Sequence, residues 1–316
     1  MHGFTTISIS THANIGVVIP TLNAGQRWPD CLSALSMQSL KPHRQLIVDS
    51  GSTDETVTLA QAAGSELIGI ARADFNHGGT RQFAAEQLND CDIVVFLTQD
   101  AILADSDALA ELIRCFDDPQ VAVAYGRQLP HKNANPIEAH ARIFNYGEVT
   151  QKKDLAAGRR LGAKVFFCSN SFAAYRRSTL LGLGGFRSDL ILGEDAEFAA
   201  RAIKAGFANV YCAAALAYHS HSYTVGEVFW RYFDTGVFHA RNIWMRQEFG
   251  THGGEGLRFV KSEIRYLVAH APLEIPRALI HTLAKAAGYQ IGRREKVLPR
   301  RLKPLLSMTP GYWRPR

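Results

Sequence analysis

The first part of the chain alternates short, β-rich apolar runs with segments of helical spacing. The apolar runs are predicted to be buried strands and lie at residues 15–20, 45–49 and 93–97. The segments between them have the spacing of helices and lie at residues 28–39, 55–63 and 80–88. Strand–helix–strand units with short polar joints connect through right-handed crossovers. The chain is therefore predicted to form an α/β fold, with an open, mainly parallel sheet and helices on both faces.

Polar residues follow each predicted strand. Residues 20–23 (Pro-Thr-Leu-Asn) follow the first strand, Asp49 ends the second, and Asp100 comes shortly after the third. The carboxyl ends of parallel strands lie along one edge of the sheet, where open α/β sheets bind their ligands. Three polar segments in register predict a single site at this edge.

An acidic pair, Glu194-Asp195, stands between a glycine turn and an amphipathic segment that ends at Gly206. Carboxylates at a helix start complement the helix dipole, a contribution of about 0.3–1 kcal/mol. A carboxylate beside a binding cleft can instead work as a base. The polar strand ends upstream favour the second interpretation.

The composition is that of a globular protein, with 47% hydrophobic and 20% charged residues. No stretch approaches the roughly 18 uncharged apolar residues of a membrane-spanning helix. Residues 1–14 lack the basic start and apolar stretch of a secretory signal, so we expect a cytoplasmic protein. The five cysteines are widely separated, without a Cys-x-x-Cys pair, and are expected to be reduced and mostly buried.

The C-terminal part of the chain is strongly basic. Between Arg277 and Arg316 ten Lys and Arg residues accompany one acid, Glu295. Such a segment is attracted to polyanionic surfaces. Nucleic acid is not expected as the partner, because no recognised nucleic-acid-binding motif accompanies the charge.

Residues 269–291 favour an anionic membrane as that partner. They carry a discontinuous apolar face beside Arg277, His281 and Lys285, and Tyr312 and Trp313 stand near the end of the chain. Apolar faces flanked by cations, with aromatic side chains, suit the headgroup zone of a bilayer. The alternative is a helix that packs on the main domain with its cations in solvent.

Four motifs occur in a fixed order between residues 15 and 221. They are Ile-Pro-Thr-Leu-Asn, Val-Asp-Ser-Gly-Ser-Thr-Asp-Glu-Thr, the aspartate after Phe-Leu-Thr-Gln, and Gly-Gly-Phe followed by Gly-Glu-Asp-Ala-Glu-Phe. Together they resemble the successive signatures of inverting family 2 glycosyltransferases. Residues 74–81, 96–101 and 219–224 are also similar to the bacterial rhamnosyltransferase branch, which builds surface polysaccharides from dTDP-L-rhamnose.

The resemblance implies a nucleotide-diphospho-sugar transferase fold of the GT-A type. It also implies inverting transfer of a sugar, L-rhamnose from dTDP-L-rhamnose, to a saccharide acceptor that is lipid-linked. Such an enzyme, active in the synthesis of polysaccharides such as O-antigen and lipopolysaccharide, is expected at the inner face of the bacterial cell membrane. The alternatives are another donor such as a UDP-sugar, a sugar-phosphate nucleotidyltransferase, and a non-catalytic carbohydrate or membrane adaptor.

The resemblance also implies the residues of the donor pocket. Asp49 would accept a hydrogen bond from N3 of a pyrimidine, unless it only caps its own turn. An arginine near the nucleotide corresponds to Arg81, a suitable partner for an anion. The other donor-binding candidates are Pro20, Thr21, Leu22, Asn23, Asn76, His77, Gly79, Gln99 and Asn170. For Asn76 and His77, stabilisation of their own loop is the alternative.

Asp100 stands where the family carries the last aspartate of its Asp-x-Asp metal motif, here Thr98-Gln99-Asp100. With one carboxylate, the ion must take its other ligands from diphosphate oxygens, water and a histidine. Oxygen ligands of this kind select Mg²⁺ or Mn²⁺. His219 follows a predicted strand at residues 210–218 and is the favoured histidine ligand, ahead of His221. A buried histidine of the core is the alternative for either.

Asp195 is predicted to be the general base. Inversion at an anomeric carbon needs an acceptor oxygen that attacks opposite the departing diphosphate and loses its proton to a carboxylate within hydrogen-bond reach. Glu194 would orient the acceptor or set the basicity of Asp195.

The chain is predicted to have three parts. These are an N-terminal tail (1–14), a glycosyltransferase domain (15–224) and a helical, basic C-terminal region (225–316). Within the domain, residues 129–160 are predicted to form a loop over the donor site. Residues 167–172 are predicted to form a strand that faces the sugar.

Overall fold

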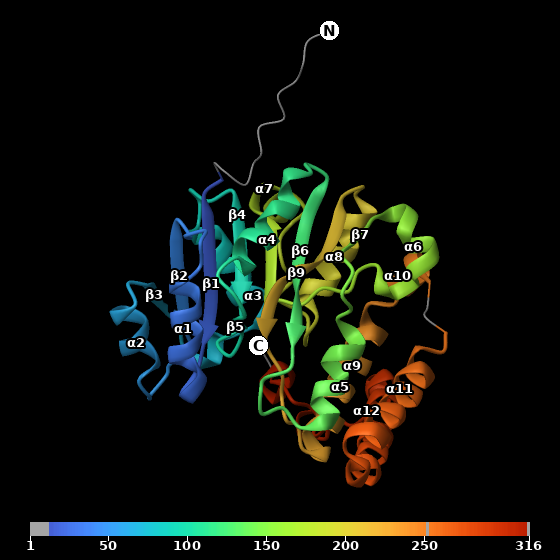
Figure 1. Ribbon diagram of the computed structural model, residues 1–316. Helices are drawn as coiled ribbons and strands as arrows, with labels where there is room; N and C mark the ends of the chain where they lie inside the picture. Colours follow the sequence, from blue (N-terminus) through green and yellow to red (C-terminus); the bar gives the residue numbers. More distant parts are fainter. Residues whose placement is uncertain (1–12, 251–252, 315–316) are drawn as a thin grey trace.

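The computed structural model describes residues 13–250 and 253–314 (Figure 1). The strands are β1 (Ile15–Thr21), β2 (Arg44–Asp49), β3 (Glu66–Gly69), β4 (Ile93–Leu97), β5 (Ile102–Leu103), β6 (Val121–Leu129), β7 (Gln151–Lys153), β8 (Phe172–Arg176) and β9 (Ala208–Tyr218). The helices are α1 (Trp28–Ser36), α2 (Thr56–Ala62), α3 (His77–Gln87), α4 (Ala108–Arg114), α5 (Pro136–Asn145), α6 (Leu155–Leu161), α7 (Arg177–Gly182), α8 (Glu194–Lys204), α9 (Val225–Arg241), α10 (Ile243–Phe249), α11 (Glu255–His270), α12 (Ile275–Arg293) and α13 (Lys303–Leu306). The predicted N-terminal tail lies almost wholly outside the described residues.

One mixed sheet forms the centre of the protein. Its order is β3-β2-β1-β4-β8-β6-β9-β5, and β7 also pairs with β9. Strands β3, β2, β1 and β4 pair in parallel, as do β6 and β9, whereas β8 is antiparallel to both of its neighbours. Among the described strands, β5, β7 and β8 thus run against the common direction. The prediction of an open, mainly parallel sheet is confirmed.

The central strands are buried on both faces, which explains their continuous apolar runs. Every residue of β1 is buried. Val18 and Phe96 belong to a hydrophobic cluster that includes residues of α3, α8 and α9, whereas Val17 and Val95 belong to one that includes residues of α1, α2 and α4. Side chains that alternate along each strand therefore meet helices on both faces, as predicted. The five cysteines are free thiols and four of them are buried, also as predicted.

Two predictions about the middle of the chain are wrong. Residues 129–160 are not a loop, because they contain α5, β7 and α6. The side chain of Asn135 accepts a hydrogen bond from the backbone N of Glu138 and Asp154 does the same for Ala157, so each caps the start of a helix. Residues 167–171 are not part of a strand either, since β8 begins at Phe172 and Asn170 lies in the turn before it.

The C-terminal helices pack against the sheet domain through α9. Phe233 and Val237 of α9 belong to the same hydrophobic cluster as Val18 and Phe96. Helix α12 packs closely along α9, because glycines face the partner backbone at the contact. A Cβ atom on Gly288 would lie 2.3 Å from the carbonyl oxygen of Phe229. The predicted boundary at residue 225 coincides with the start of α9, and the division into domains stays a prediction.

Replacing Gly288 with alanine is expected to destabilise the protein. Helix propensity alone would favour alanine by about 0.8–1 kcal/mol. The added methyl group would instead press on backbone and force α9 and α12 apart, so we expect the free energy of unfolding to fall by about 1–2 kcal/mol. Chemical denaturation measures the change. Gly256→Ala on α11 is the matched control, because no atom lies within 4 Å of its added Cβ. If both variants were stabilised, the close contact of α9 and α12 would be contradicted.

Two of the three side chains predicted beside the apolar face of residues 269–291 do not flank it. Most of this segment is α12, which begins at Ile275 after α11 ends at His270. His281 is buried, and Lys285 lies over the ring of Phe259, with its Nζ 4.5 Å from the ring centroid. Neither side chain can therefore flank an exposed apolar face as a solvated cation.

The aromatic residues near the end of the chain do not project as a free anchor either. They lie in a short 3₁₀ helix, η8 (Pro310–Trp313), where the ring of Trp313 lies near Phe233 and the hydroxyl of Tyr312 donates to the carbonyl oxygen of Asp189. Sequence spacing could not reveal these contacts with distant parts of the chain. Among the described residues, no helix has the length and apolarity that crossing a bilayer requires.

Candidate active site

The first group of predicted residues surrounds Asp49 at the carboxyl ends of β1 and β2. Its carboxylate accepts hydrogen bonds from the hydroxyls of Thr21 (2.9 Å) and Ser52 (2.5 Å) and from the backbone N of Gly51 and Ser52. Burial alone would raise the pKa of Asp49, but these hydrogen bonds outweigh it and lower the pKa below its usual value. Asp49 therefore holds its own turn as an anion, and a nucleobase N–H would have to replace one of the two hydroxyl donors.

Gln99 connects this group to the end of β4. Its side-chain oxygen accepts from the backbone N of Leu22 (2.8 Å), and its side-chain nitrogen donates to the carbonyl oxygen of Leu22 (3.2 Å). Asn23, at φ 45°, is held by the backbone N of Thr53, which donates to its side chain. Residues 20–23, Asp49 and Gln99 are thus brought together, as predicted. Gln99 fixes the backbone that leads to Asp100.

Asp100 forms a compact cluster with His219 and His221. The carboxylate oxygens lie 3.5 Å from Nε2 of His219 and 3.5 Å from Nδ1 of His221. One ligand atom from each of the three residues lies within 4.8 Å of the others. Side-chain ligands bind a first-row metal at about 2.0–2.2 Å, so two of them are at most about 4.4 Å apart. A small closure of these side chains would therefore let them share one ion.

Gln128 of β6 fixes the tautomer of His219. Arg142 can only donate, and its Nη1 donates to Oε1 of Gln128 (2.7 Å). The same Oε1 lies 2.9 Å from Nδ1 of His219, so this ring nitrogen must carry the proton and donate. Nε2 of the neutral ring then presents its lone pair towards Asp100. Two acceptors face each other without a proton between them, an arrangement that a bound cation would stabilise.

The second group of predicted residues surrounds the acidic pair at the start of α8. Gly193, in the left-handed region at φ 78°, leads into the helix at Glu194. The buried carboxylate of Glu194 accepts from Arg81 (3.0 Å) and from the side-chain nitrogen of Asn170 (3.0 Å). Asp195 accepts from the backbone N of Asn170 (3.0 Å) and of Ala196 (2.7 Å). Glu194, Asp195, Arg81 and Asn170 therefore form one network.

The surroundings of the pair shift the pKa values of its two carboxyl groups in opposite directions. Burial, followed by the charge of Glu194, raises the pKa of Asp195 to about 6. Burial also acts to raise the pKa of Glu194, but the charge of Arg81 and further contacts with His77 and Asn170 outweigh it and lower that pKa. Environments that shift the pKa values of two neighbouring carboxyl groups in opposite directions are characteristic of acid–base sites. Glu194 stays ionised, while Asp195 is poised to take up a proton.

The segment before Arg81 makes contacts that stabilise its own loop and the start of α3. The side chain of Asn76 accepts from the backbone N of Gly79 (2.7 Å) and so caps α3. His77 packs near Arg81, which donates to its carbonyl oxygen (3.1 Å). A Cβ atom on Gly78 would lie 2.0 Å from the carbonyl oxygen of Arg187, so glycine lets α3 approach the loop before α8. These contacts fit the loop-stabilising alternative for Asn76, and a role in donor binding stays a prediction.

A chain of contacts connects the three predicted carboxylates along one edge of the sheet. Thr21 contacts Asp49, and the next residue, Leu22, binds Gln99, which precedes Asp100. Asp100 contacts His219, which is held by Gln128, and Gln128 donates to Ser169 beside Asn170. Asn170 then contacts Asp195. No described contact joins Asp49, Asp100 and Asp195 directly.

Sequence reasoning missed Gln128 and Arg142. Gln128 is a buried amide near the end of β6, directly after Arg127, where the apolar run of that strand stops. The end of this run is the one signal in the sequence. Arg142 lies in the segment that was predicted to be a loop, so its position on α5 facing Gln128 could not be inferred.

The comparisons with known proteins agree with this geometry. The family described as glycosyl transferase family 2 matches residues 16–183. The O-antigen chain rhamnosyltransferase RfbN of Salmonella typhimurium (strain LT2) is 51% identical over 95% of this chain and 96% of its own length. The O-antigen chain rhamnosyltransferase WbaN of Salmonella anatum is 49% identical over 94% of this chain and 95% of its own length.

Solved structures support the fold. The mannosyltransferase PcManGT from Pyrobaculum calidifontis, in complex with GDP-Man and Mn²⁺, has a TM-score of 0.56 and 16% identity, over 99% of this chain and 88% of that one. Residues 1–349 of TarS from S. aureus, in complex with UDP, have a TM-score of 0.52 and 14% identity, over 90% and 91% of the two chains. At this identity the likeness concerns the fold, which is the GT-A-like arrangement that the sequence predicted.

Proposed function

Because the chain belongs to glycosyltransferase family 2, we propose that it is an inverting rhamnosyltransferase that moves L-rhamnose from dTDP-L-rhamnose to a saccharide acceptor. The acceptor is lipid-linked and belongs to the synthesis of a cell-surface polysaccharide such as O-antigen. Two O-antigen chain rhamnosyltransferases are about 50% identical to this chain over nearly its full length. This similarity supports rhamnose as the transferred sugar and polysaccharide synthesis as the process. The nucleotidyltransferase and adaptor alternatives are not favoured by these relatives.

The observation that carries the catalytic proposal is the environment of Asp195. The residue as a whole is partly exposed, while desolvation of its carboxyl group and the charge of Glu194 raise its pKa to about 6. A base with a pKa near the working pH takes a proton efficiently and still spends most of its time ionised. We assign Asp195 as the base that receives the proton of the acceptor hydroxyl. Glu194, held by Arg81 and Asn170, sets the basicity of Asp195.

Asp100, His219 and His221 fit a divalent metal, and we propose that they hold Mn²⁺ or Mg²⁺. The facing lone pair of His219 and carboxylate of Asp100 support a cation at this point. Diphosphate oxygens of the donor and water would complete the ligand set. When bound, the ion would offset the negative charge that develops on the leaving diphosphate.

The donor assignment is tested by the thermal stability of the wild-type protein with nucleoside diphosphates. We expect dTDP to raise Tm more than GDP or CMP, and more in the presence of Mn²⁺ than without it. The control is dTMP, which has the same base and sugar with one phosphate fewer. A larger rise with GDP than with dTDP would contradict the rhamnose donor. An equal rise with UDP and dTDP would leave the donor sugar to be settled by turnover of dTDP-L-rhamnose against UDP-sugars.

The activity is expected to depend on pH through Asp195. Its protonated form cannot accept a proton, so kcat/KM should fall as the pH drops through about 6. Glu194→Gln removes the negative charge that raises this pKa, while the positive charge of Arg81 stays nearby. The ionised form of Asp195 is therefore favoured in this variant. The acid limb of the pH profile should therefore move to lower pH in this variant. A limb that stays in place or moves up would contradict the assignment of Asp195 as the titrating base.

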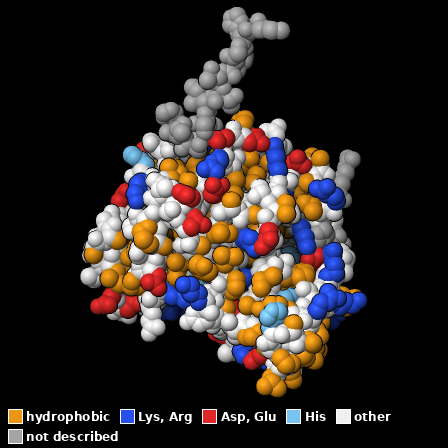
Figure 2. All heavy atoms as spheres, viewed as in Figure 1, with side chains coloured by type: hydrophobic (Ala, Val, Ile, Leu, Met, Phe, Trp, Pro, Cys, Tyr) orange, Lys and Arg blue, Asp and Glu red, His pale blue; other side chains and the backbone are white. Residues whose placement is uncertain are grey.

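We also propose that the protein works at the cytoplasmic face of the membrane, which it contacts through α11 and α12. The exposed apolar side chains of these helices and their connection are Leu257, Val268, Leu273, Leu279, Ile280 and Leu283. Exposed cations accompany them at Arg258, Lys261, Arg265 and Arg277. In Figure 2, hydrophobic side chains lie beside Lys and Arg at the lower right, where Figure 1 places α11 and α12. Apolar groups ringed by cations suit an anionic bilayer surface.

A further inference from the structure

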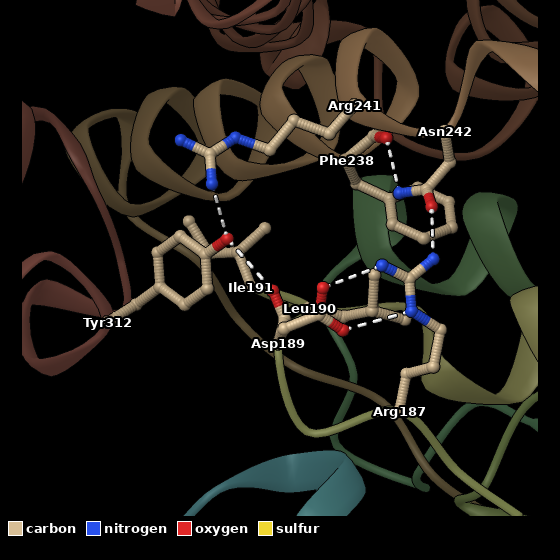
Figure 3. Close-up of a pocket in the computed structure, with 8 residues that line it drawn as sticks. All are labelled: Arg187, Asp189, Leu190, Ile191, Phe238, Arg241, Asn242 and Tyr312. Atoms are coloured by element: carbon tan, nitrogen blue, oxygen red, sulfur yellow. Dashed lines mark hydrogen bonds and ion pairs between the residues drawn. The ribbon is translucent and has the colours of Figure 1, made fainter. Parts of the chain in front are cut away.

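A hollow of ≈ 590 Å³ lies between the C-terminal segment and the loop that leads to α8. Its lining combines four cations, two aromatic rings and one carboxylate, namely Arg241, Arg300, Lys303, Arg314, Tyr312, Trp313 and Asp189. A smaller hollow of ≈ 60 Å³ adjoins it and shares Asp189, Arg241 and Tyr312 (Figure 3). The larger volume falls within the range of about 300–1,000 Å³ that small-ligand sites have.

The charges around this hollow do not balance. Glu295, at the start of the 3₁₀ helix η7 (Glu295–Val297), pairs with both Arg241 (2.9 Å) and Lys303 (2.6 Å). Asp189 pairs with Arg187 of the smaller hollow (2.6 Å). Arg300 and Arg314 are exposed and form no ion pair with any residue that the structure describes. Arg187 also lies 3.8 Å from the carboxylate of Glu197. Five cations therefore stand against three carboxylates among the described residues, which leaves a local excess of positive charge.

The hollow is attached to the loop that carries the acidic pair. The hydroxyl of Tyr312 donates to the carbonyl oxygen of Asp189 (3.0 Å), and Nη1 of Arg241 donates to the oxygen of Tyr312 (2.7 Å), as Figure 3 shows. Leu190 and Ile191 line the smaller hollow, and the chain then continues through Gly193 to Glu194-Asp195. Asp189 and Asp195 are six residues apart, so the chain between them spans at most about 20 Å.

We propose that this hollow binds the phosphate or diphosphate group of the lipid-linked acceptor, an inference that rests on the proposed function. The fork of a guanidinium group matches two phosphate oxygens, and Arg300 and Arg314 form no ion pair with a carboxylate in the described part of the chain. The saccharide of the acceptor would extend from this group along the loop towards Asp195. The donor diphosphate is bound elsewhere, at the edge of the sheet that carries Asp100. The hollow thus selects acceptors that carry phosphate at the end opposite the reacting hydroxyl.

The test measures the binding of geranyl diphosphate to the full-length protein by calorimetry, with the donor site filled by saturating dTDP and excess Mg²⁺. The variant is Arg300→Ala with Arg314→Ala. The matched control is Arg294→Ala with Arg301→Ala, which removes two exposed arginines that do not line the hollow. Because charge-assisted hydrogen bonds to phosphate are lost, we expect the Kd of the hollow variant to rise about tenfold to a hundredfold. The control should stay within about twofold of wild type.

Two results would overturn the proposal. One is the absence of geranyl diphosphate binding in wild type, or an equal loss in both double variants, which would indicate general electrostatic attraction. The other comes from vesicles of phosphatidylcholine with and without phosphatidylglycerol. If the hollow variant loses binding to the anionic vesicles more than the control does, the hollow serves membrane headgroups instead. A failure of the transferase proposal is separate, since it appears as no rhamnosyl transfer from dTDP-L-rhamnose by the wild-type protein.

Discussion

Replacing Asp195 with asparagine is expected to lower kcat by about 10²- to 10⁴-fold, the usual contribution of a general base. Asparagine keeps the size of the side chain, and its oxygen can still accept a hydrogen bond from the backbone N of Asn170 or Ala196. It cannot take up the proton of the acceptor hydroxyl. The KM for the donor should change little, because Asp195 itself has no predicted contact with the donor. Initial rates with dTDP-L-rhamnose and the lipid-linked acceptor measure both constants.

Asp30→Asn is the matched control for this variant. Asp30 is an exposed aspartate in the first turn of α1, just as Asp195 lies in the first turn of α8. Both substitutions remove a negative charge from a helix start, which is worth about 0.3–1 kcal/mol of stability. Similar Tm values with a loss of kcat confined to Asp195→Asn would separate catalysis from folding. Comparable kcat in Asp195→Asn and wild type would refute the base assignment.

The parts of the site that follow directly from the sequence are those set by neighbouring residues. Asp49 and Asp100 were predicted at one edge of the sheet because each follows an apolar run that is buried on both faces. Asp195 was placed at a helix start because a glycine turn precedes it and helical spacing follows. In each case the residue and the element that positions it are adjacent in the chain.

The contacts between distant segments could not be inferred in this way. Gln128 fixes the tautomer of His219 only because β6 pairs with β9, and these two residues are 91 positions apart in the sequence. Similarly, the alternation of apolar residues in α12 could not show which side meets α9. That side is selected by glycines that allow backbone contact, so His281 and Lys285 turn inward.

The tail aromatics illustrate a third limit. Tyr312 and Trp313 are typical of interfacial anchors by composition, yet Tyr312 binds the carbonyl oxygen of Asp189, 123 residues away. Their surroundings include Arg241 and Lys303, which lie over the Trp313 ring at 5.3 Å. The same residue types therefore line a positively charged hollow beside the acidic loop. Composition identified the excess of charge, but it could not predict that part of this charge lines the hollow.

Replacing Asp100 with asparagine is expected to reduce kcat/KM by about 10²- to 10³-fold, which corresponds to the loss of one strong electrostatic contact in the transition state. Asparagine removes the single carboxylate of the Asp100–His219–His221 cluster, so the affinity for Mn²⁺ or Mg²⁺ should fall with it. A measurement without turnover is the rise in Tm that Mn²⁺ adds to saturating dTDP. This increment should be present in wild type and absent in Asp100→Asn.

The control for the metal prediction is Asp105→Asn, an exposed aspartate five positions further along the chain and outside the cluster. It should keep the Mn²⁺ increment, because its carboxylate accepts from the backbone N of Asp107 and contacts no residue of the cluster. His219→Ala should lose the increment as Asp100→Asn does. The wild-type ring offers the lone pair of Nε2 to the ion, and Gln128 holds the ring so that this lone pair faces the Asp100 carboxylate. If Mn²⁺ adds nothing to the stabilisation of wild type by dTDP, the cluster is not a metal site. A proton shared by Nε2 of His219 and the Asp100 carboxylate would then have to separate the two acceptors, while Nδ1 still donates to Gln128.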